Sequence, residues 1–283
     1  MKNLSEKTIV LTGATAGVGK ETARQLAQMG HRVALVGRDA KKGRQVLDEI
    51  SSQTRNNNLY FFGADLSKQV DIRRLATQLE ESFSCIDVLL NNAGAIFFRR
   101  QYSVDGIEMT FALNHLNYFL LTHLLLDRLQ AGRQARIINV ASVAHKNAKV
   151  DFKNLYRENH YLAGWAAYSQ SKLCNIMFTY VLARKLGGTG ITVNTLHPGF
   201  VNSQFGNNNR GFHTFAFQLA KKTMGISEIK GAKTSVFLAT SPQLSDQTGG
   251  YYVDCRCMRT SPASYDEVVQ RRLWDVSREL VAI

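Results

Sequence analysis

Short apolar runs alternate with helix-like segments along almost the whole 283-residue chain. Runs of the kind that form buried strands occupy residues 8–13, 32–37, 59–65, 86–94, 135–142, 191–199 and 249–254. Residues 19–30 and 40–53 have small and apolar side chains at helical spacing, and residues 264–280 are typical of a closing helix. Buried strands that alternate with helices predict a parallel sheet covered on both faces. We therefore expect one α/β domain over residues 1–283, with a doubly wound parallel sheet of about seven strands.

The longest apolar stretch, residues 111–129, predicts a buried helix. Two Asn, two His and one Asp interrupt it, which makes it too polar to span a bilayer. The sequence therefore predicts no transmembrane span. The first residues, MKNLSEKTIVLTG, lack the apolar core of a signal peptide. These features favour a cytoplasmic protein.

Residues 200–225 depart from the alternation, because they are polar and Asn-rich at first and aromatic later. A mobile loop with a short amphipathic helix has this pattern, and we expect a lid over a substrate site. Its aromatic side chains could pack over an apolar substrate, with Phe205 as the predicted contact, while Lys221 and Lys222 face water or anionic lipid. The alternative is an ordinary lid helix whose aromatic residues belong to the core.

The chain is strongly basic, with 35 Lys and Arg against 22 Asp and Glu and a formal net charge of +13. Such a charge raises the question of a nucleic acid or an anionic membrane as partner. However, the sequence has no run of four or more basic residues and no nucleic-acid-binding module. We therefore expect no nucleic-acid partner, at most weak peripheral contact with a membrane, and an anionic cofactor bound by a generally basic protein.

The four cysteines, Cys85, Cys174, Cys255 and Cys257, do not have the pattern of a disulfide framework. Cys255 and Cys257 flank one arginine, but no second Cys/His cluster exists to complete a tetrahedral zinc site. The sequence therefore predicts free thiols in a reducing compartment and no bound metal.

The first apolar run leads into TGATAGVGK, residues 12–20, which is rich in glycine. Without a Cβ atom, Gly13, Gly17 and Gly19 would let the backbone approach a pyrophosphate at the start of the following helix. The spacing is G-x-x-x-G-x-G and not the general G-x-G-x-x-G fingerprint, so a simple tight turn is the alternative. The strand before the turn and the helix after it favour a phosphate cradle. The other residues expected in this cradle are Thr15, Ala16 and Val18.

A candidate catalytic pair lies in AAYSQSKLCN, residues 166–175. Tyr168 and Lys172 are four positions apart in a predicted helix and therefore share one face. Reduction of a carbonyl needs a hydride from a cofactor and a proton donor. Tyrosine, whose pKa is ordinarily about 10, suits the second task when a cation lowers that pKa. Ser142 follows an apolar run, so its hydroxyl is expected at the carboxyl end of the sheet, where it can hydrogen-bond the substrate oxygen. Alone, each of these residues is more often part of an exposed helix face or a turn.

The order and spacing of these motifs resemble those of the short-chain dehydrogenases/reductases. The resemblance covers nearly the whole chain, and it rests on the glycine turn, NNAG at 91–94, Asn114, Ser142, Tyr-x-x-x-Lys at 168 and 172, and PG at 198–199. Longer stretches such as DGIEMTFALNHLNYFLLTHLLLDRL are similar to the branch that contains retinol dehydrogenases and light-dependent protochlorophyllide reductases. The resemblance implies a single-domain Rossmann fold and hydride transfer between a nicotinamide cofactor and a carbonyl or alcohol.

The resemblance also implies roles for individual residues. Tyr168 would contact the cofactor and the substrate and act as acid or base, Lys172 would bind the nicotinamide ribose, and Asn114 would hold a water molecule for a proton relay. Asp65 would lie at the adenine edge, and it could also cap the next helix. Ser203 takes the place of a threonine that contacts the carboxamide. The other residues expected at the cofactor are Leu66, Asn91, Asn92, Ala93, Gly94, Pro198, Gly199 and Val201.

The end of the second apolar run, LVGRD, bears on the choice of dinucleotide. NAD enzymes of this topology commonly have a carboxylate there, but Gly37 stands at that position and Arg38 follows it. An uncharged residue beside a guanidinium favours the 2′-phosphate of NADP. Asp39 is expected to cap the next helix or to reach the ribose. We therefore expect NADP(H) rather than NAD(H).

The aromatic lid favours a lipophilic substrate, such as a retinal-like or other apolar aldehyde or ketone. One alternative is a light-dependent protochlorophyllide reductase, because Cys174 lies where that group often has a cysteine, although the long insertion expected there is absent. The other is a non-catalytic NADP(H)-binding sensor or scaffold, which would typically have lost the Tyr168–Lys172 pair. The resemblance implies a homodimer or homotetramer formed through the long helices at about 105–130 and 161–187.

Overall fold

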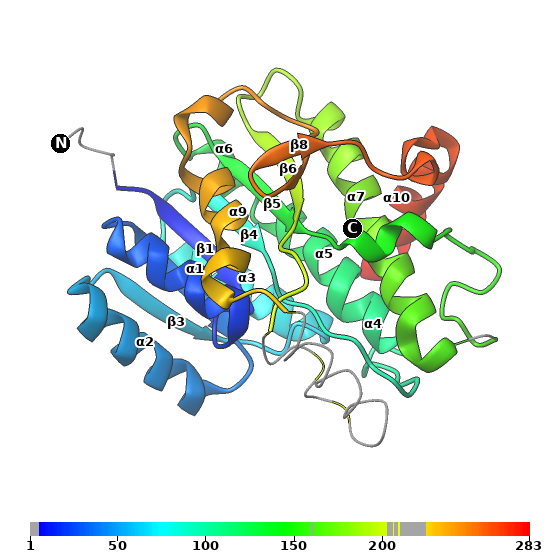
Figure 1. Cartoon of the computed structure of the whole chain (residues 1–283), viewed down its shortest axis with the longest axis horizontal. Coiled ribbons are helices and arrows are strands. Elements are labelled where there is room, and N and C mark those ends of the chain that lie inside the picture. Colours follow the sequence, from blue (N-terminus) through cyan, green and yellow to red (C-terminus); the bar gives the residue numbers. More distant parts are fainter. Residues whose placement is uncertain (1–5, 160, 203–205, 207–208, 210–224) are drawn as a thin grey trace.

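The computed structural model describes residues 6–159, 161–202, 206, 209 and 225–283. In this part of the chain, a central sheet is covered by helices on both faces (Figure 1). The strands are β1 Thr8–Thr12, β2 Arg32–Gly37, β3 Leu59–Gly63, β4 Val88–Asn91, β5 Arg136–Val140, β6 Thr192–His197, β7 Tyr251–Val253 and β8 Arg256–Met258. They lie in the order β3-β2-β1-β4-β5-β6-β7-β8, which is the Rossmann order extended by two strands.

In the described part of the chain, the sheet contains the expected parallel strands, seven in number, and β8 adds one antiparallel strand at its edge. β1 to β7 pair in parallel, whereas β8 is antiparallel to β7. In the turn between β7 and β8, Asp254 and Cys255 have φ values of 47° and 63°, the left-handed geometry of a two-residue hairpin. All three residues of β8 are exposed, so no apolar pattern marks this strand in the sequence.

Two groups of helices cover the two faces of the sheet. The helices are α1 Gly17–Gln28, α2 Ala40–Thr54, α3 Gln69–Ser82, α4 Met109–Phe111, α5 Asn117–Leu124, α6 Leu126–Gln130, α7 Trp165–Lys185, α9 Glu228–Thr240 and α10 Glu267–Val281. One core contains side chains of α1, α2 and α9, and the other contains side chains of α3, α5, α6, α7 and α10. Along β1, Ile9 and Leu11 belong to the first core and Val10 to the second. Because both faces are buried, the strand appears in the sequence as a continuous apolar run.

The apolar stretch 111–129 is buried as predicted, but it is not one helix. It is divided among the end of α4, a π-helical turn over Ala112–Leu116, α5 and α6. In the π-helical turn, the Asn114 side chain bonds to both the N–H and the C=O of Ala95, each at 2.9 Å. Such turns insert an extra residue and often occur at functional sites. No described helix is long and apolar enough to cross a membrane.

Helix α10 covers the helices that were expected to form an oligomer interface. The Trp274 ring packs against the rings of Phe119 on α5 and Phe178 on α7, with centroids 5.0 and 6.0 Å apart. Ser277 Oγ lies 2.9 Å from His115 Nε2. On this side the apolar surface of α5 and α7 is therefore used within the chain, and it does not by itself indicate an interface with a second copy.

The predicted lid over residues 200–225 lies mostly outside the described residues. The predicted contacts that fall outside them are Ser203, Phe205, Lys221 and Lys222. Asn209 is described, and its side chain bonds to Ile96 O and to Phe98 N, both at 2.7 Å. These bonds attach residue 209 to the loop that follows β4.

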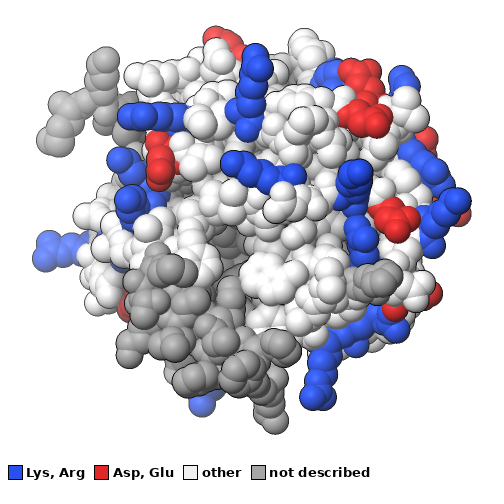
Figure 2. Space-filling view, turned by 45° about the vertical axis from the view of Figure 1, so that its right-hand side comes forward, with Lys and Arg blue, Asp and Glu red and all other residues white. Residues whose placement is uncertain are grey.

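The basic residues are spread over the visible surface rather than gathered. On the face shown in Figure 2, Lys and Arg side chains are separated by uncharged residues, and Asp and Glu lie among them. The described residues of this face therefore form a generally basic surface without a continuous stripe of one charge.

Candidate active site

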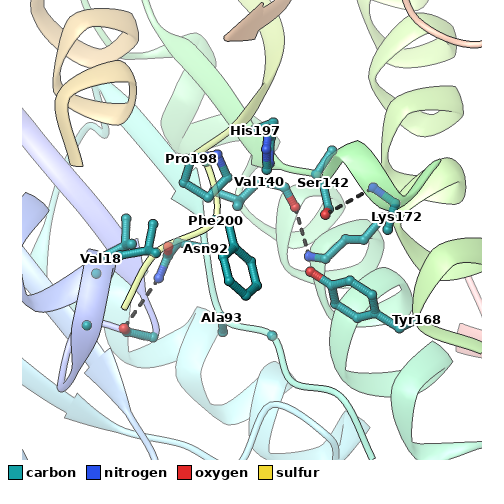
Figure 3. A pocket seen from close by; sticks show the side chains of 18 of the residues that line it. Val18, Asn92, Ala93, Val140, Ser142, Tyr168, Lys172, His197, Pro198 and Phe200 are labelled. Carbon is teal, nitrogen blue, oxygen red and sulfur yellow. Dashed lines mark hydrogen bonds between the residues drawn. The ribbon is translucent and has the colours of Figure 1, made fainter. Parts of the chain in front are cut away.

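A cavity of about 460 Å³ lies at the carboxyl edge of the parallel strands, where ligands bind in doubly wound sheets. Its walls come from the turn after β1, the segment after β4, the end of β5, α7 and the segment after β6 (Figure 3). These elements bring together most of the predicted site residues. The predicted residues that line the cavity are Gly13, Thr15, Ala16, Gly17, Val18, Gly19, Asn92, Ala93, Gly94, Ser142, Tyr168, Lys172, Pro198, Gly199 and Val201.

The turn after β1 and the first turn of α1 each contain one position with room only for glycine. Gly13 has a φ of +67°, and a Cβ atom there would lie 2.8 Å from Ala93 Cα. A Cβ atom on Gly19 would collide with the carbonyl oxygen of Gly13. Helix α1 begins at Gly17, two residues earlier than predicted. Its N-cap residue, Ala16, makes no side-chain hydrogen bond to the N–H groups of the first turn. This helix start lines the cavity, where its N–H groups and dipole can attract an anion.

Hydrogen bonds fasten the segment after β4 to the end of β1. Thr12 Oγ1 accepts from the backbone N–H groups of Asn92 and Ala93, at 2.9 and 3.0 Å. Asn92 Nδ2 donates to Thr12 O at 2.8 Å. Asn91, by contrast, is fully buried and donates to Asn139 Oδ1 at 2.9 Å. Contrary to expectation, Asn91 therefore does not line the cavity.

At the end of β2, glycine stands in place of the carboxylate of a typical NAD enzyme, and a larger residue would have to displace the side chain of Thr15. A Cβ atom on Gly37 would lie 2.5 Å from Thr15 Cγ2. Asp39 caps α2 by accepting a hydrogen bond from Lys42 N at 3.0 Å, which was one of its two expected roles. Arg38, between them, is exposed and lies outside the cavity lining. The carboxylate next to Arg38 is therefore already used in capping.

Asp65 and Leu66 also lie outside the cavity lining. Asp65 Oδ1 accepts hydrogen bonds from the N–H and the hydroxyl of Ser67, at 3.2 and 2.8 Å. Leu66 is buried in the core. The N-cap residue of α3 is Lys68, so the prediction that Asp65 caps this helix is wrong. A contact of either residue with adenine stays a prediction.

Asn114 is fully buried and does not line the cavity. Its Nδ2 donates to Ser171 Oγ at 3.0 Å as well as to Ala95 O, and its backbone oxygen accepts from Asn175 Nδ2 at 2.9 Å. Asn114 thus joins the segment after β4 to the helix that carries Tyr168. Its role in a proton relay stays a prediction.

Tyr168 and Ser142 point into the same part of the cavity (Figure 3). A hydrogen bond joins their side chains, and Ser142 Oγ also accepts from Ala144 N at 3.2 Å. Burial raises the pKa of Tyr168 to about 12, and the bond to Ser142 acts in the opposite direction. The expectation that a neighbouring cation lowers this pKa is not met, because burial has the larger effect and favours the neutral phenol.

Lys172 lies beside Tyr168 on α7, as the spacing of four predicts. Its Nζ donates to Val140 O at 2.9 Å (Figure 3) and lies 5.7 Å from the centroid of the Tyr168 ring. Burial lowers the pKa of Lys172 to about 7, because a desolvated ammonium is costly. Near neutral pH the residue therefore exists in both charged and neutral forms. A Cβ atom on Gly94 would lie 3.4 Å from this Nζ, so the glycine leaves space for it.

The cavity also has an apolar side that the sequence did not reveal. Val143, Trp165 and Phe200 line it and are 46%, 42% and 40% exposed. The edge of the Trp165 ring contacts Tyr168, with centroids 6.1 Å apart. Trp165 precedes Tyr168 by three positions, so helical spacing was the signal that could have found it. These side chains offer an apolar surface next to the polar group of Ser142 and Tyr168.

His197 lines the cavity at the end of β6. Burial lowers the pKa of His197 to about 4, and repulsion from His145 adds to this effect. Its Nδ1 is buried without a hydrogen-bond partner among the described residues. At neutral pH His197 is therefore uncharged, and Lys172 is the cavity residue that can carry a positive charge beside Tyr168.

Comparisons with known proteins identify the family of the chain. The profile of the family described as short chain dehydrogenase matches residues 7–212. The chain is 40% identical to retinol dehydrogenase 11 of Homo sapiens over 280 residues, which are 99% of this chain and 87% of that protein. It is 39% identical to retinol dehydrogenase 12 of Bos taurus, over 98% of this chain and 87% of that protein.

Two solved structures show the same architecture. An uncharacterized protein from Mycobacterium paratuberculosis is 28% identical, with a TM-score of 0.77 and coverage of 99% of this chain and 96% of that chain. The RhlG/NADP complex of Pseudomonas aeruginosa is 26% identical, with a TM-score of 0.71 and coverage of 88% of this chain and 94% of that chain.

The Rossmann order of the strands and the side chains of Ser142, Tyr168 and Lys172 around one cavity define an oxidoreductase that acts on an alcohol or a carbonyl. The family match and the retinol dehydrogenase relatives narrow this class. The chain belongs to the short-chain dehydrogenase family, and within it to the retinol dehydrogenase-like branch.

Proposed function

We propose that the protein transfers a hydride between NADP(H) and an apolar alcohol or carbonyl substrate, with Tyr168 as the acid or base. The observation that carries this proposal is that Ser142, Tyr168 and Lys172 line the same cavity as the glycine turn. An anion-binding helix start and a proton donor thus belong to one ligand site, as a dinucleotide-dependent oxidoreductase requires.

The residues present fit a nicotinamide dinucleotide. Gly13 and Gly19 keep the backbone accessible at the start of α1, whose N–H groups can bind a pyrophosphate. When bound, the dinucleotide supplies or accepts the hydride. The RhlG structure, which this chain resembles, was solved with NADP. Arg38 is exposed beside an Asp39 that caps α2, and this supports NADP(H) over NAD(H), because a guanidinium can bind the 2′-phosphate.

Tyr168 donates its proton to the carbonyl oxygen in the reduction and takes it back in the oxidation. Burial keeps the phenol neutral because its pKa is raised to about 12, and the neutral phenol is the form that reduction requires. Ser142 donates a hydrogen bond to the same oxygen as negative charge develops there. Lys172 binds the nicotinamide ribose, and its ammonium stabilises the tyrosinate that remains. Asn114 supports α7 through Ser171 and is the proposed residue of the proton relay.

An apolar substrate suits the open side of the cavity. Val143, Trp165 and Phe200 line it together with Ser142 and Tyr168 and offer aliphatic and aromatic surface there. The relatives are named retinol dehydrogenases. We therefore infer that the substrate is a retinoid or a similar lipophilic alcohol or aldehyde. A lid at residues 200–225, with Phe205 at the substrate and Ser203 at the carboxamide, belongs to the same proposal.

Turnover of a panel of aldehydes with NADPH and with NADH tests this function. Retinal and long aliphatic aldehydes should be reduced in the dark, with a higher kcat/KM for NADPH, and short polar aldehydes should be poorer substrates. Binding of NADPH without any turnover would instead indicate a sensor or scaffold. Light-dependent turnover of protochlorophyllide would indicate the other alternative, although Cys174, which favoured it, is buried in the core.

A cytoplasmic location, weak peripheral contact with membranes and a homodimer or homotetramer complete the proposal. Cell fractionation tests the location, and recovery of most of the protein with membranes after a salt wash would contradict it. Sedimentation of the purified protein tests the oligomer, and a monomer at all concentrations would contradict that part.

A further inference from the structure

Tyr118 is a buried residue of α5 for which the proposed mechanism provides no role. Its side chain is 0% exposed, and the centroid of its ring lies 5.6 Å from Lys172 Nζ. The π-helical turn over Ala112–Leu116 comes immediately before α5. Tyr118 lies near Lys172, although the two residues are far apart in the sequence.

The buried ammonium of Lys172 has few other partners among the described residues. Its Nζ donates one hydrogen bond, to Val140 O at 2.9 Å, although an ammonium carries three N–H donors. The Tyr168 ring lies 5.7 Å away. His197, the titratable group of β6 near it, repels it when both are charged. Among the described residues, the rings of Tyr118 and Tyr168 lie close enough to Nζ to attract this cation through their faces.

We propose that Tyr118 is a positioning residue, and that the face of its ring holds the Lys172 ammonium beside Tyr168 by a cation–π interaction. The negative face of an aromatic ring attracts a cation within about 6 Å, and the attraction is strongest when both groups are desolvated. This inference rests on the role proposed above for Lys172, and it adds a residue that lies outside the cavity lining.

The ring of Tyr118 carries this role, and its hydroxyl does not. Tyr118 Oη is buried and has no hydrogen-bond partner within the described residues, and an unpartnered buried hydroxyl destabilises the fold. Phenylalanine at this position would keep the ring face and remove the hydroxyl. Leucine would keep an apolar side chain and remove the ring, so these two substitutions separate the attraction from the packing.

Titration of Lys172 in the protein without dinucleotide tests the proposal. In protein labelled with ¹³C-lysine, the Cε chemical shift follows the protonation of Lys172, and its signal is assigned by its loss in Lys172→Arg. Burial already lowers the pKa of Lys172 to about 7. In Tyr118→Leu, loss of the ring should lower it further by about 0.5–1.5 pH units. In Tyr118→Phe it should stay nearly unchanged.

Phe119→Leu is the matched control. Phe119 is the next residue of α5 and is also buried, but it packs against Phe178 and Trp274 instead of Lys172. Its leucine variant should lose a comparable amount of packing while the pKa of Lys172 keeps its wild-type value. If the leucine variants are too unstable to titrate, replacement of Tyr118 by pentafluorophenylalanine keeps the shape of the ring and removes the attraction of its face. This replacement should also lower the pKa.

Two results would overturn the proposal. An unchanged pKa of Lys172 in Tyr118→Leu, or in the fluorinated protein, would mean that the ring only fills space. A pKa lowered as much in Tyr118→Phe as in Tyr118→Leu would assign the effect to the hydroxyl. Because no dinucleotide or substrate is present, the titration gives its answer even if the proposed hydride transfer is wrong. If the proposed hydride transfer is right, the binding of NADPH should weaken as the pH rises and Lys172 loses its proton. In Tyr118→Leu the pH at which this weakening occurs should be lower by the same amount as the pKa of Lys172.

Discussion

Burial acts on both ionisable groups of the Tyr168–Lys172 pair and favours the neutral form of each. It raises the pKa of Tyr168 to about 12 and lowers the pKa of Lys172 to about 7. The spacing of four along a helix therefore brings the two groups together but does not by itself make the tyrosine more acidic. Groups that stabilise the negative charge on the substrate oxygen in the transition state, above all Ser142, should therefore contribute more to the rate of reaction.

Ser142→Ala should lower kcat by about 10²–10³-fold, because the substrate oxygen loses a hydrogen-bond donor in the transition state. The Kd of NADPH should change little, and Ser142→Thr, which keeps a hydroxyl, should retain more activity. Steady-state kinetics measure the loss. Since Ser142 also accepts a bond from Ala144 N, urea unfolding of the variant is needed as a control. A kcat close to the wild-type value would contradict the proposed role.

Arg38→Asp should move the ratio of kcat/KM for NADPH to that for NADH toward NADH by about 10–100-fold, because charge-assisted bonds to the 2′-phosphate are lost. Lys41→Asp makes the same change of charge at an exposed position of α2 and should leave the ratio nearly unchanged. Equal ratios in Arg38→Asp and in the wild type would refute the assignment of Arg38.

The residues of the motifs could be predicted from the sequence, because their positions follow from the conformation of the backbone within a few residues. Gly13 and Gly19 stand where a Cβ atom would collide with another part of the chain, and Tyr168 and Lys172 share a face because of helix geometry alone. Tyr118 could not be predicted in this way. Its approach to Lys172 is a contact between α5 and α7, two helices distant in the sequence, and no pattern of apolar residues predicts such a contact.

At the scale of secondary-structure elements, the apolar pattern predicted which segments are buried, but not into which helices and turns a buried segment is divided. Residues 111–129 are buried, yet they form three helical pieces and a π-helical turn. β8 was missed, because a short exposed strand has no apolar residues to mark it. The resemblance implied an oligomer formed through the helices that include α5 and α7, and α10 packs on these two helices on one side. Such coverage depends on contacts between residues distant in the sequence, which periodicity does not encode.

The two tryptophans of the chain should separate substrate binding from helix packing. Trp165→Ala should raise KM for a long apolar aldehyde about 10-fold through lost apolar contact, with little change in Tm, because its ring is 42% exposed. Trp274→Ala should lower the free energy of unfolding by about 2–4 kcal/mol and leave KM unchanged, since Trp274 holds α10 against Phe119 and Phe178. A change of KM in Trp274→Ala together with a loss of stability in Trp165→Ala would contradict the roles assigned to both tryptophans.

At the scale of the whole molecule, several histidines with lowered pKa values shape the response to acid, above all His115 and His197. Burial lowers the pKa of His115 to about 4 and that of His197 to about 4, whereas an unfolded histidine titrates at about 6.5. Between these values the unfolded chain binds protons that the folded protein does not bind. Stability is therefore present above about pH 6.5 and is lost as the pH falls toward 4.

Urea unfolding should show a loss of about 3 kcal/mol for each of His115 and His197 between pH 7 and pH 4. Glu108 acts in the opposite direction, because burial raises its pKa and the folded protein takes up that proton first. His115→Gln should be less stable at pH 7 but should lose about half of the pH dependence that the two histidines cause. A variant with the full wild-type dependence would contradict the burial of a neutral imidazole at position 115.

The measurement that tests the central claim most directly is single-turnover oxidation of NADPH by retinal in Tyr168→Phe. The phenylalanine keeps a ring against Trp165 and removes only the hydroxyl, so the variant should bind NADPH with the wild-type Kd. The rate of hydride transfer should fall by at least about 10²–10⁴-fold, because the proton donor is gone. A rate close to that of the wild type would contradict the assignment of Tyr168 as the acid.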